Sequence, residues 1–360
     1  MKKVSKGIAA LLCGAMIAAA GSCSTGSGPM VINGQELRAG IYILKQQAAV
    51  NEALTKLKEE QPDLDTTPEH FDFLGQTVEG KSFAQWVYDK TIEGCKEYVA
   101  VEQLFADNNL TLGPEVEAQI DSYINSVWGY SLGDKTYGET FEHLGVSQQS
   151  YKEAQLGVQK EGILFDYLYS TGGPNAVSDE ELNAKIAEKY VGINYISYKL
   201  ENGTPAQEYA DMIKNGETFE EVYQKYYKEE YSGEEYVESG SDSAYTYNVQ
   251  LPETDSMIHV MTREDTYPSG EMVAYAFDNM SVGDVAVVNV TDSEEDTVFI
   301  VQKVDLSTRP NLTSEYTSTI RHELKDDEFD EYLKNTYSSY SVNEGSTRSD
   351  YKLEKMLYDE

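Results

Sequence analysis

Few residues in this chain have the types and spacing that catalysis or metal binding requires. Its four histidines, at positions 70, 143, 259 and 322, are scattered and share no ligand spacing, which argues against a zinc site. The acidic turn DSEED, residues 292–296, lacks the spaced ligands of a calcium loop and is interpreted as a solvated turn. There is no glycine-rich phosphate loop and no HExxH pair. The sequence therefore predicts no metal and no other cofactor.

The start of the chain has the pattern of an export signal. A basic segment, MKKVSK, precedes the 14-residue apolar stretch GIAALLCGAMIAAA, and small residues lead directly to Cys23. This resembles a bacterial lipoprotein signal, although Ala20 stands where a leucine is usual. We expect residues 1–22 to be removed and Cys23 to be lipidated, which places the protein on the outer face of a bacterial cell membrane. An ordinary secretory signal cut near Ser22 is the alternative.

The segment after the signal, residues 23–29, is rich in glycine and serine and predicts a flexible tether. Removal of the signal takes Cys13 away, so Cys95 has no second free thiol with which to form an internal disulfide. It lies in a helical pattern, without the local histidine and aspartate that would mark a nucleophile. We interpret Cys95 as a buried structural residue.

The charge balance restricts the possible partners. The chain has 28 Lys and Arg against 63 Asp and Glu, a formal net charge of −35. Phosphate binding needs a basic face, so a nucleic-acid partner is excluded, and adhesion to anionic lipid by charge is disfavoured. An acidic surface keeps a chain soluble and attracts cations or basic polypeptides; solvation alone is the alternative interpretation.

Apolar residues in the first half of the mature chain recur at spacings of three and four. Residues 30–190 are therefore predicted to form an all-α region. Helix starts are indicated at Pro114, which follows a glycine, and after the capping residues Ser147 and Ser178.

From residue 192 the apolar spacing changes to two. Residues 191–307 predict a module in the order β-α-α-(irregular)-α-β-β, with an irregular insert at 231–270 and a final β-hairpin. Residues 308–360 predict one more helix and a polar tail, which we expect to pack back on the helical region. The predicted fold class is therefore α+β.

Three segments of this module carry a family resemblance. They are YISYKL at 195–200, AQEYADMIKNGETFEEVYQKY at 206–226, and AYAFDNMSVGDVAVVNV at 274–290 with the strand TVFIVQKVD. Together they resemble a parvulin-type peptidyl-prolyl isomerase domain. A helical region before the module and a lone helix behind it are similar to the lipid-anchored extracytoplasmic foldases of Gram-positive bacteria. The resemblance implies a chaperone-like helical region joined to a parvulin-like module.

In that family two histidines on adjacent strands lie beneath a pocket lined by a methionine and a phenylalanine. The first-strand histidine falls on Tyr195, or on Asn194 with a shift of one, and the closing-strand histidine falls on Phe299. The pocket phenylalanine falls near Met272 and the pocket methionine near Pro268. Phe277 matches the phenylalanine of the family's Ala-x-Phe motif. The resemblance thus implies a degenerate pocket of Tyr195, Met272, Phe277 and Phe299; cross-strand core packing is the alternative for Tyr195 and Phe299.

These observations predict a folding factor that binds unfolded, newly exported polypeptides, with weak or absent isomerase activity. An active peptidyl-prolyl isomerase is one alternative, because twisting an X-Pro amide needs a shaped apolar pocket and hydrogen bonds but no nucleophile or metal. A lipid-anchored solute-binding protein is another, although that fold needs two lobes of alternating strands and helices. The oligomeric state is left open.

Overall fold

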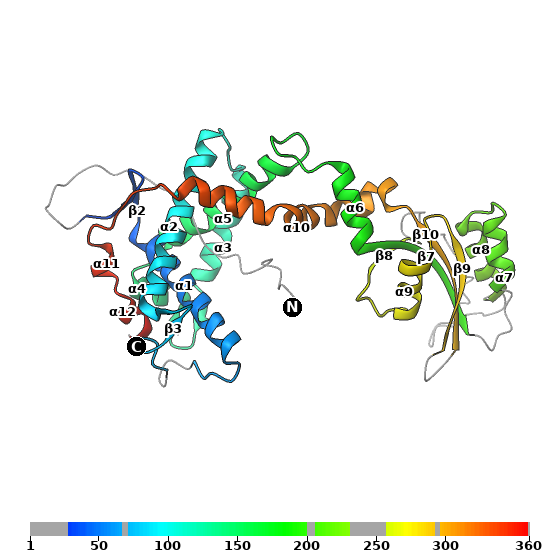
Figure 1. Ribbon diagram of the computed structural model, residues 1–360, viewed down its shortest axis with the longest axis horizontal. Helices are drawn as coiled ribbons and strands as arrows, with labels where there is room; N and C mark the ends of the chain where they lie inside the picture. Colours follow the sequence, from blue (N-terminus) through cyan, green and yellow to red (C-terminus); the bar gives the residue numbers. More distant parts are fainter. Residues whose placement is uncertain (1–27, 67–70, 200–205, 231–256, 292–295, 359–360) are drawn as a thin grey trace, which may run out of the picture. The chain divides into compact units, whose positions relative to one another are not determined.

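The structure, a computed structural model, describes residues 28–66, 71–199, 206–230, 257–291 and 296–358 (Figure 1). The predicted signal, Cys23, most of the tether, the acidic turn and most of the insert at 231–270 lie outside the described residues. Contacts divide the chain into two units. The first unit is formed by residues 1–176 together with 325–360, and the second by residues 177–324.

Helices dominate the first unit, and their starts follow the capping signals. Pro114 occupies the first turn of its helix, and the Ser147 hydroxyl accepts a hydrogen bond from the Ser150 backbone N–H, as the sequence predicted. The helices of this unit are α1 (Ala39–Glu60), α2 (Phe83–Asp107), α3 (Pro114–Trp128), α4 (Tyr137–Leu144), α5 (Gln148–Tyr169), the end of α10 (Pro310–Tyr337), α11 (Thr347–Asp350) and α12 (Leu353–Tyr358).

Short strands interrupt this region, which the sequence predicted to be all-α. One sheet has the order β11–β1–β2, and two hairpins pair β3 with β4 and β5 with β6. The segment MVING at 30–34 is strand-like in sequence and contains β1, but strands of two or three residues are otherwise too short to give a recognisable alternation of apolar and polar residues. Their bounds are β1 (Met30–Ile32), β2 (Gln35–Leu37), β3 (Thr77–Val78), β4 (Lys81–Ser82), β5 (Ser131–Leu132), β6 (Lys135–Thr136) and β11 (Val342–Asn343).

The end of the chain belongs to this first unit. Strand β11 pairs antiparallel with β1, and the Met30 backbone N–H donates to the Thr347 hydroxyl over 3.0 Å. Leu353 of α12 is buried in the same apolar cluster as Phe83 and Trp86 of α2. Residues from both ends of the sequence therefore complete one core.

The second unit is built on one antiparallel sheet with the strand order β8–β7–β10–β9. The predicted hairpin of β9 and β10 is confirmed by their continuous antiparallel register. The elements are α6 (Asp179–Lys189), β7 (Tyr190–Lys199), α7 (Ala206–Lys214), α8 (Phe219–Glu230), β8 (His259–Thr262), α9 (Gly270–Asn279), β9 (Val285–Thr291), β10 (Asp296–Val304), the 3-10 helix η3 (Leu306–Thr308) and the start of α10.

Strand β8 was not predicted, because its four residues fall within the segment that we interpreted as irregular. It pairs with the first half of β7, from Tyr190 opposite Thr262 to Ile193 opposite His259. An edge strand this short gains its order from the neighbouring strand and carries little signal of its own. The module therefore has one strand more than expected.

Side chains alternate between the two faces of this sheet, as the pleat requires. Helices α7 and α8 cover one face, where Ile196, Val298 and Ile300 are buried, and α9 covers the other (Figure 1). Each face has its own apolar cluster, so both sides of the central strands are buried.

The α+β class predicted from the sequence is confirmed. By contacts, helix α6 groups with the sheet, whereas the sequence analysis placed residues up to 190 with the helical region. The described strands pair antiparallel, unlike the alternating lobes that a solute-binding protein would need. Across residues 28–358, apart from the gaps, no helix combines the length and apolar character of a membrane span.

Candidate functional site

The four residues predicted to form the degenerate pocket lie together on one face of the second unit's sheet. Met272 and Phe299 are buried in the apolar cluster under α9, and Tyr195 and Phe277 pack against it with partial exposure. We call this set the α9 face. Its centre is filled by core side chains, including Phe299, and the partly exposed rings of Tyr195 and Phe277 lie towards its margin.

Strand register determines which groups lie beside Tyr195. The ring centroid of Tyr195 is 6.0 Å from that of Phe299 on the neighbouring strand β10, in an edge-to-face arrangement. On the other side, β8 brings His259 to 4.8 Å from the same tyrosine ring. Burial, together with the neighbouring Tyr267 and Tyr223, raises the pKa of Tyr195, so its hydroxyl stays protonated.

His259 is not among the site residues that the sequence predicts. It stands in the segment that gave no strand signal, and only the pairing of β8 with β7 places it on the α9 face. Its side chain is exposed on the edge strand, and partial desolvation by its neighbours lowers the pKa of the imidazole, which favours the neutral ring at neutral pH. A neutral imidazole and a tyrosine hydroxyl, both able to donate and accept hydrogen bonds, therefore lie side by side at the margin of this face.

The ring of Phe277 lies against a charged side chain. The Arg263 guanidinium lies 4.4 Å from the ring centroid and also pairs with Asp278 over 2.9 Å. The helix that bears Phe277 is anchored by Lys303, whose ammonium donates to the carbonyls of Ala276 at 2.9 Å and Met280 at 2.8 Å. A cation at these C-terminal carbonyls satisfies acceptors that the helix leaves open.

Two further positions were predicted, and one of them is on the other side of the sheet. Asn194, the alternative to Tyr195, is buried on the face of α7 and α8 and donates to the Gln302 side-chain oxygen over 3.1 Å. Its own side-chain oxygen has no hydrogen-bond partner. Pro268 lies just before α9 and is partly exposed. The structure therefore brings together Tyr195, Met272, Phe277 and Phe299 but not Asn194.

This arrangement can hold apolar and prolyl side chains against aromatic rings, with hydrogen bonds from a neutral tyrosine and a neutral histidine. Among the described residues no group of three or more His, Cys, Asp or Glu is placed to bind a metal. Cys95 is buried in the core of the first unit.

Two small pockets lie in the first unit. The larger has a volume of about 230 Å³ and is lined by α3, α4, α5 and the turn that follows α3; its lining residues are Tyr123, Ser126, Val127, Tyr130, Tyr137 and Tyr151. We call it the tyrosine cavity. Behind it, Trp128 stacks on Phe141 with centroids 5.9 Å apart, so an aromatic cluster supports its wall.

The smaller cavity has a volume of about 10 Å³, which is about the space that one water molecule needs. It is lined by Lys45, Glu97 and Glu161, among others. Burial raises the pKa of Glu161 to about 7, and the nearby carboxylate of Glu97 acts in the same direction. Lys45 opposes this rise, whereas Asp326 and Asp330 of α10 add to it.

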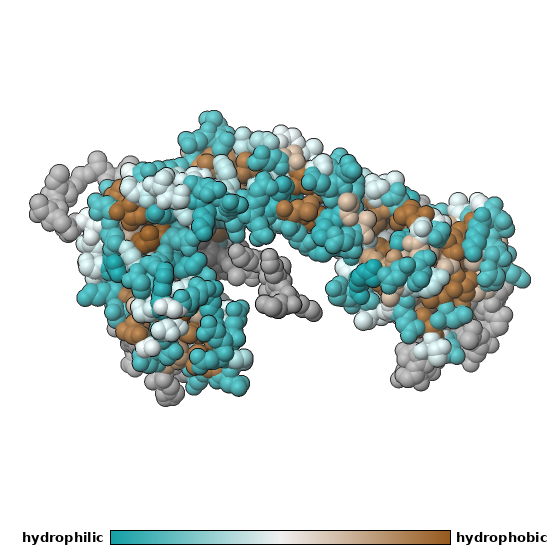
Figure 2. Space-filling model, viewed as in Figure 1, coloured by the Kyte–Doolittle hydropathy of each residue, from teal (hydrophilic) through white to brown (hydrophobic). Residues whose placement is uncertain are grey.

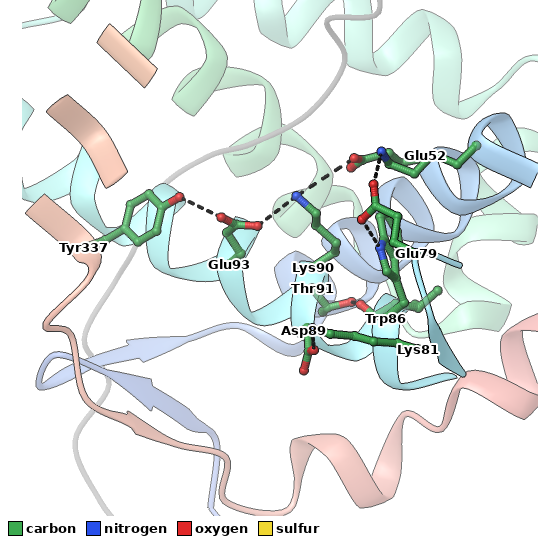
Figure 3. Close-up of polar contacts among 11 residues, drawn as sticks. Glu52, Glu79, Lys81, Trp86, Asp89, Lys90, Thr91, Glu93 and Tyr337 are labelled. Atoms are coloured by element: carbon green, nitrogen blue, oxygen red, sulfur yellow. Dashed lines mark hydrogen bonds and ion pairs between the residues drawn. The ribbon is translucent and has the colours of Figure 1, made fainter. Parts of the chain in front are cut away.

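A network of charged and polar side chains surrounds α2 (Figure 3). Some of its groups have shifted pKa values, but its contacts serve to hold the elements together. Glu79 accepts from the Lys56 ammonium at 2.7 Å and from the Trp86 indole N–H at 2.9 Å, which lowers the pKa of its carboxyl. Lys90 pairs with Glu93 at 3.0 Å. Each of these charges is matched by a partner, so the network links α1, the β3–β4 hairpin and α2 and offers no free reactive group.

Comparison with known proteins gives structural matches only. No protein-family model and no curated protein matches the chain. Its structure is similar to the foldase protein PrsA from Lactococcus lactis, at 12% identity and a TM-score of 0.32, covering 91% of this chain and 100% of that one.

PrsA from Streptococcus pneumoniae matches at 12% identity and a TM-score of 0.27, covering 79% of this chain and 96% of that one. PrsA from Bacillus subtilis matches at 12% identity and a TM-score of 0.24, covering 74% of this chain and 92% of that one. Over most of its length the chain is structurally similar to PrsA foldase proteins, at low identity and low TM-scores.

Proposed function

We propose that this protein is an extracytoplasmic folding factor that binds unfolded, newly exported polypeptides while held to the membrane by a lipid on Cys23. The lipid anchor rests on the signal pattern before Cys23, which lies outside the described residues. The polypeptide partner rests on the surface chemistry of the α9 face.

The observation that carries the proposal is the composition of the α9 face. Its buried members, Met272 and Phe299, fill the space beneath the helix, while Tyr195 and Phe277 keep part of their rings exposed. Partly exposed aromatic rings over a packed core give adaptable contact area at modest entropic cost. A filled face of this kind supports binding to varied apolar segments better than it supports a shaped catalytic pocket.

Surface composition is consistent with weak binding to many clients. Figure 2 shows hydrophobic residues interspersed among hydrophilic ones on the visible surface. The net charge of −35 favours clients with basic segments and repels acidic ones. This attraction should weaken as salt is added, because exposed charges are screened over about 8 Å at physiological ionic strength.

Suppression of aggregation tests the proposal. A reduced, basic secreted protein is diluted from denaturant with and without the mature chain, and light scattering is followed. We expect less scattering at equimolar amounts and a weaker effect with Phe277→Ala. Tyr275→Ala is the matched control, since this tyrosine is 37% exposed on the same helix but does not belong to the cluster. No suppression by the folded wild-type protein would refute the proposal.

A second candidate function is peptidyl-prolyl isomerisation, favoured by the pairing of His259 with Tyr195. Neutral hydrogen-bonding groups beside an apolar surface can stabilise a twisted prolyl amide. The test is a proline-peptide isomerisation assay with wild type, His259→Ala and Tyr195→Phe. Loss of rate in both variants would support catalysis here, and a wild-type rate equal to buffer at micromolar protein would exclude it.

The anchor is tested separately. Expression of the full chain in a Gram-positive host should place it in the membrane fraction, and Cys23→Ala should release it. Recovery of the Cys23→Ala protein in the membrane to the same extent would refute lipidation at this residue.

A further inference from the structure

We infer that the tyrosine cavity of the first unit is a second polypeptide-binding site, which takes the cationic side chain of an unfolded client, arginine above all. This inference rests on the proposed function, because it names the kind of client residue that the folding factor captures. The cavity lies within the first unit and shares no residue with the α9 face.

The lining has the chemistry of a cation receptor. Four of its six residues are tyrosines, which offer aromatic faces to a cation and hydroxyls to its N–H groups. Tyr130 is 65% exposed and Tyr123 is 39% exposed, so these two rings stand at the entrance. Tyr151 is buried at the back, where burial and the neighbouring Tyr123 raise its pKa and keep the hydroxyl protonated.

The walls of the cavity are held in place before a ligand arrives. Tyr137 packs edge-to-face on Phe141 at 4.9 Å, and Tyr151 lies 5.4 Å from the Trp128 ring. The Trp128 indole N–H also donates to the Glu142 carboxylate over 3.2 Å. Side chains fixed in this way lose little further freedom when a ligand binds, which favours affinity.

The size of the cavity indicates one side chain as its occupant. At about 230 Å³ it is smaller than the roughly 300–1,000 Å³ typical of small-molecule pockets. A planar guanidinium can stack on one tyrosine while its N–H groups reach neighbouring hydroxyls, which a compact ammonium does less well.

Charge selects a cation over a neutral apolar side chain. Residues 114–152, which supply the whole lining, contain six acidic residues and two lysines. One of these, Lys152, is already paired with Asp121 at 2.5 Å. The segment that supplies the lining therefore has a net negative charge, while the lining itself is uncharged, and a negative field of this kind attracts arginine and repels acidic chains.

The test uses two unstructured synthetic peptides that differ only in carrying arginine or its neutral isostere citrulline. Binding to the full mature protein is measured by calorimetry and by tryptophan fluorescence, since Trp128 touches the cavity wall. We expect the arginine peptide to bind more tightly. Tyr130→Ser should weaken its binding roughly two- to fivefold, the range for one exposed cation–π contact. The matched control is Tyr167→Ser, a 39% exposed tyrosine of the same unit that does not line the cavity.

Equal affinity for both peptides, or unchanged affinity in Tyr130→Ser, would overturn the inference. Circular dichroism shows whether each variant is folded, and Tyr123→Ser gives a second lesion at the entrance. The aggregation assay on the same variants separates the two hypotheses. If the protein suppresses client aggregation but does not prefer the arginine peptide, only the proposed arginine site is refuted. If it prefers the arginine peptide but does not suppress client aggregation, only the folding function is refuted.

Discussion

Removal of the buried carboxyl of Glu161 should stabilise the first unit at neutral pH and not at acidic pH. In the unfolded chain this carboxyl has the ordinary pKa of 4.5, and in the folded unit burial beside Glu97 raises the pKa to about 7. The folded state therefore binds the proton more tightly than the unfolded state. Stability is highest below the unfolded pKa, and it is lost as the pH rises through the folded value.

The size of the effect follows from the shift. The full difference between the two pKa values corresponds to about 3 kcal/mol at high pH, and the partial exposure of Glu161 reduces this. We expect Glu161→Gln to raise the free energy of unfolding by about 1 to 3 kcal/mol near pH 8 and to change it little near pH 5.

Tryptophan fluorescence during urea unfolding provides a selective measurement. Both tryptophans, Trp86 and Trp128, lie in the same unit as Glu161, so the signal reports on that unit alone. Glu331→Gln on α10 removes an exposed carboxylate from the same unit and is the matched control. Equal effects of Glu161→Gln at both pH values, or a gain no larger than the control's, would refute the electrostatic reasoning.

Other substitutions probe packing and capping. Lys303→Met leaves two carbonyls at the end of α9 without their donor and should destabilise the second unit by about 1 to 3 kcal/mol in thermal unfolding. In Gly162→Ala the added methyl group meets nothing within 4 Å in the interior of α5, and the variant should stabilise the first unit by about 0.5 to 1 kcal/mol. In Gly138→Ala the methyl group meets the Trp128 indole ring, and the variant should destabilise the unit. Urea unfolding measures both effects. Phe299→Ala should cost about 3 to 5 kcal/mol as a core residue, and Phe277→Ala should cost much less, by calorimetry.

Specific outcomes contradict each of these expectations. Lys214→Met replaces an exposed lysine and is the control. If Lys303→Met melts at the same temperature as this control, the hydrogen bonds from Lys303 to α9 are dispensable. Similar signs for the two glycine variants would refute the steric argument. A near-neutral Phe299→Ala would mean that this side chain lines a tolerant pocket and not a core.

Much of the fold was predictable, because its main signals are local. Ser178 and Glu181 form a reciprocal capping box, and the change to alternating residues after it marks the start of β7. The β9–β10 hairpin was readable from two apolar runs around an acidic turn. These features depend on neighbouring residues and need no knowledge of distant contacts.

The missing parts depend on long-range pairing. Strand β8 becomes a strand only beside β7, and with it His259 moves from an unassigned segment to a ring contact with Tyr195. The tyrosine cavity likewise joins side chains from three helices whose mutual packing no spacing rule specifies. Family resemblance indicated the four residues of the α9 face, but only packing shows that Phe299 is core and Phe277 is partly exposed.

The pairing of β1 with β11 has a consequence for the order in which the chain folds. As the chain emerges from its N-terminus, the residues of the second unit precede β11, and the first unit lacks its third strand and the Thr347 hydroxyl until residues 342–347 follow. Closing so long a loop is slow compared with forming local contacts. The first unit of a protein proposed to protect unfolded chains thus stays incomplete until these residues follow, and loss of the segment that contains Leu353 would expose the core around Phe83 and Trp86.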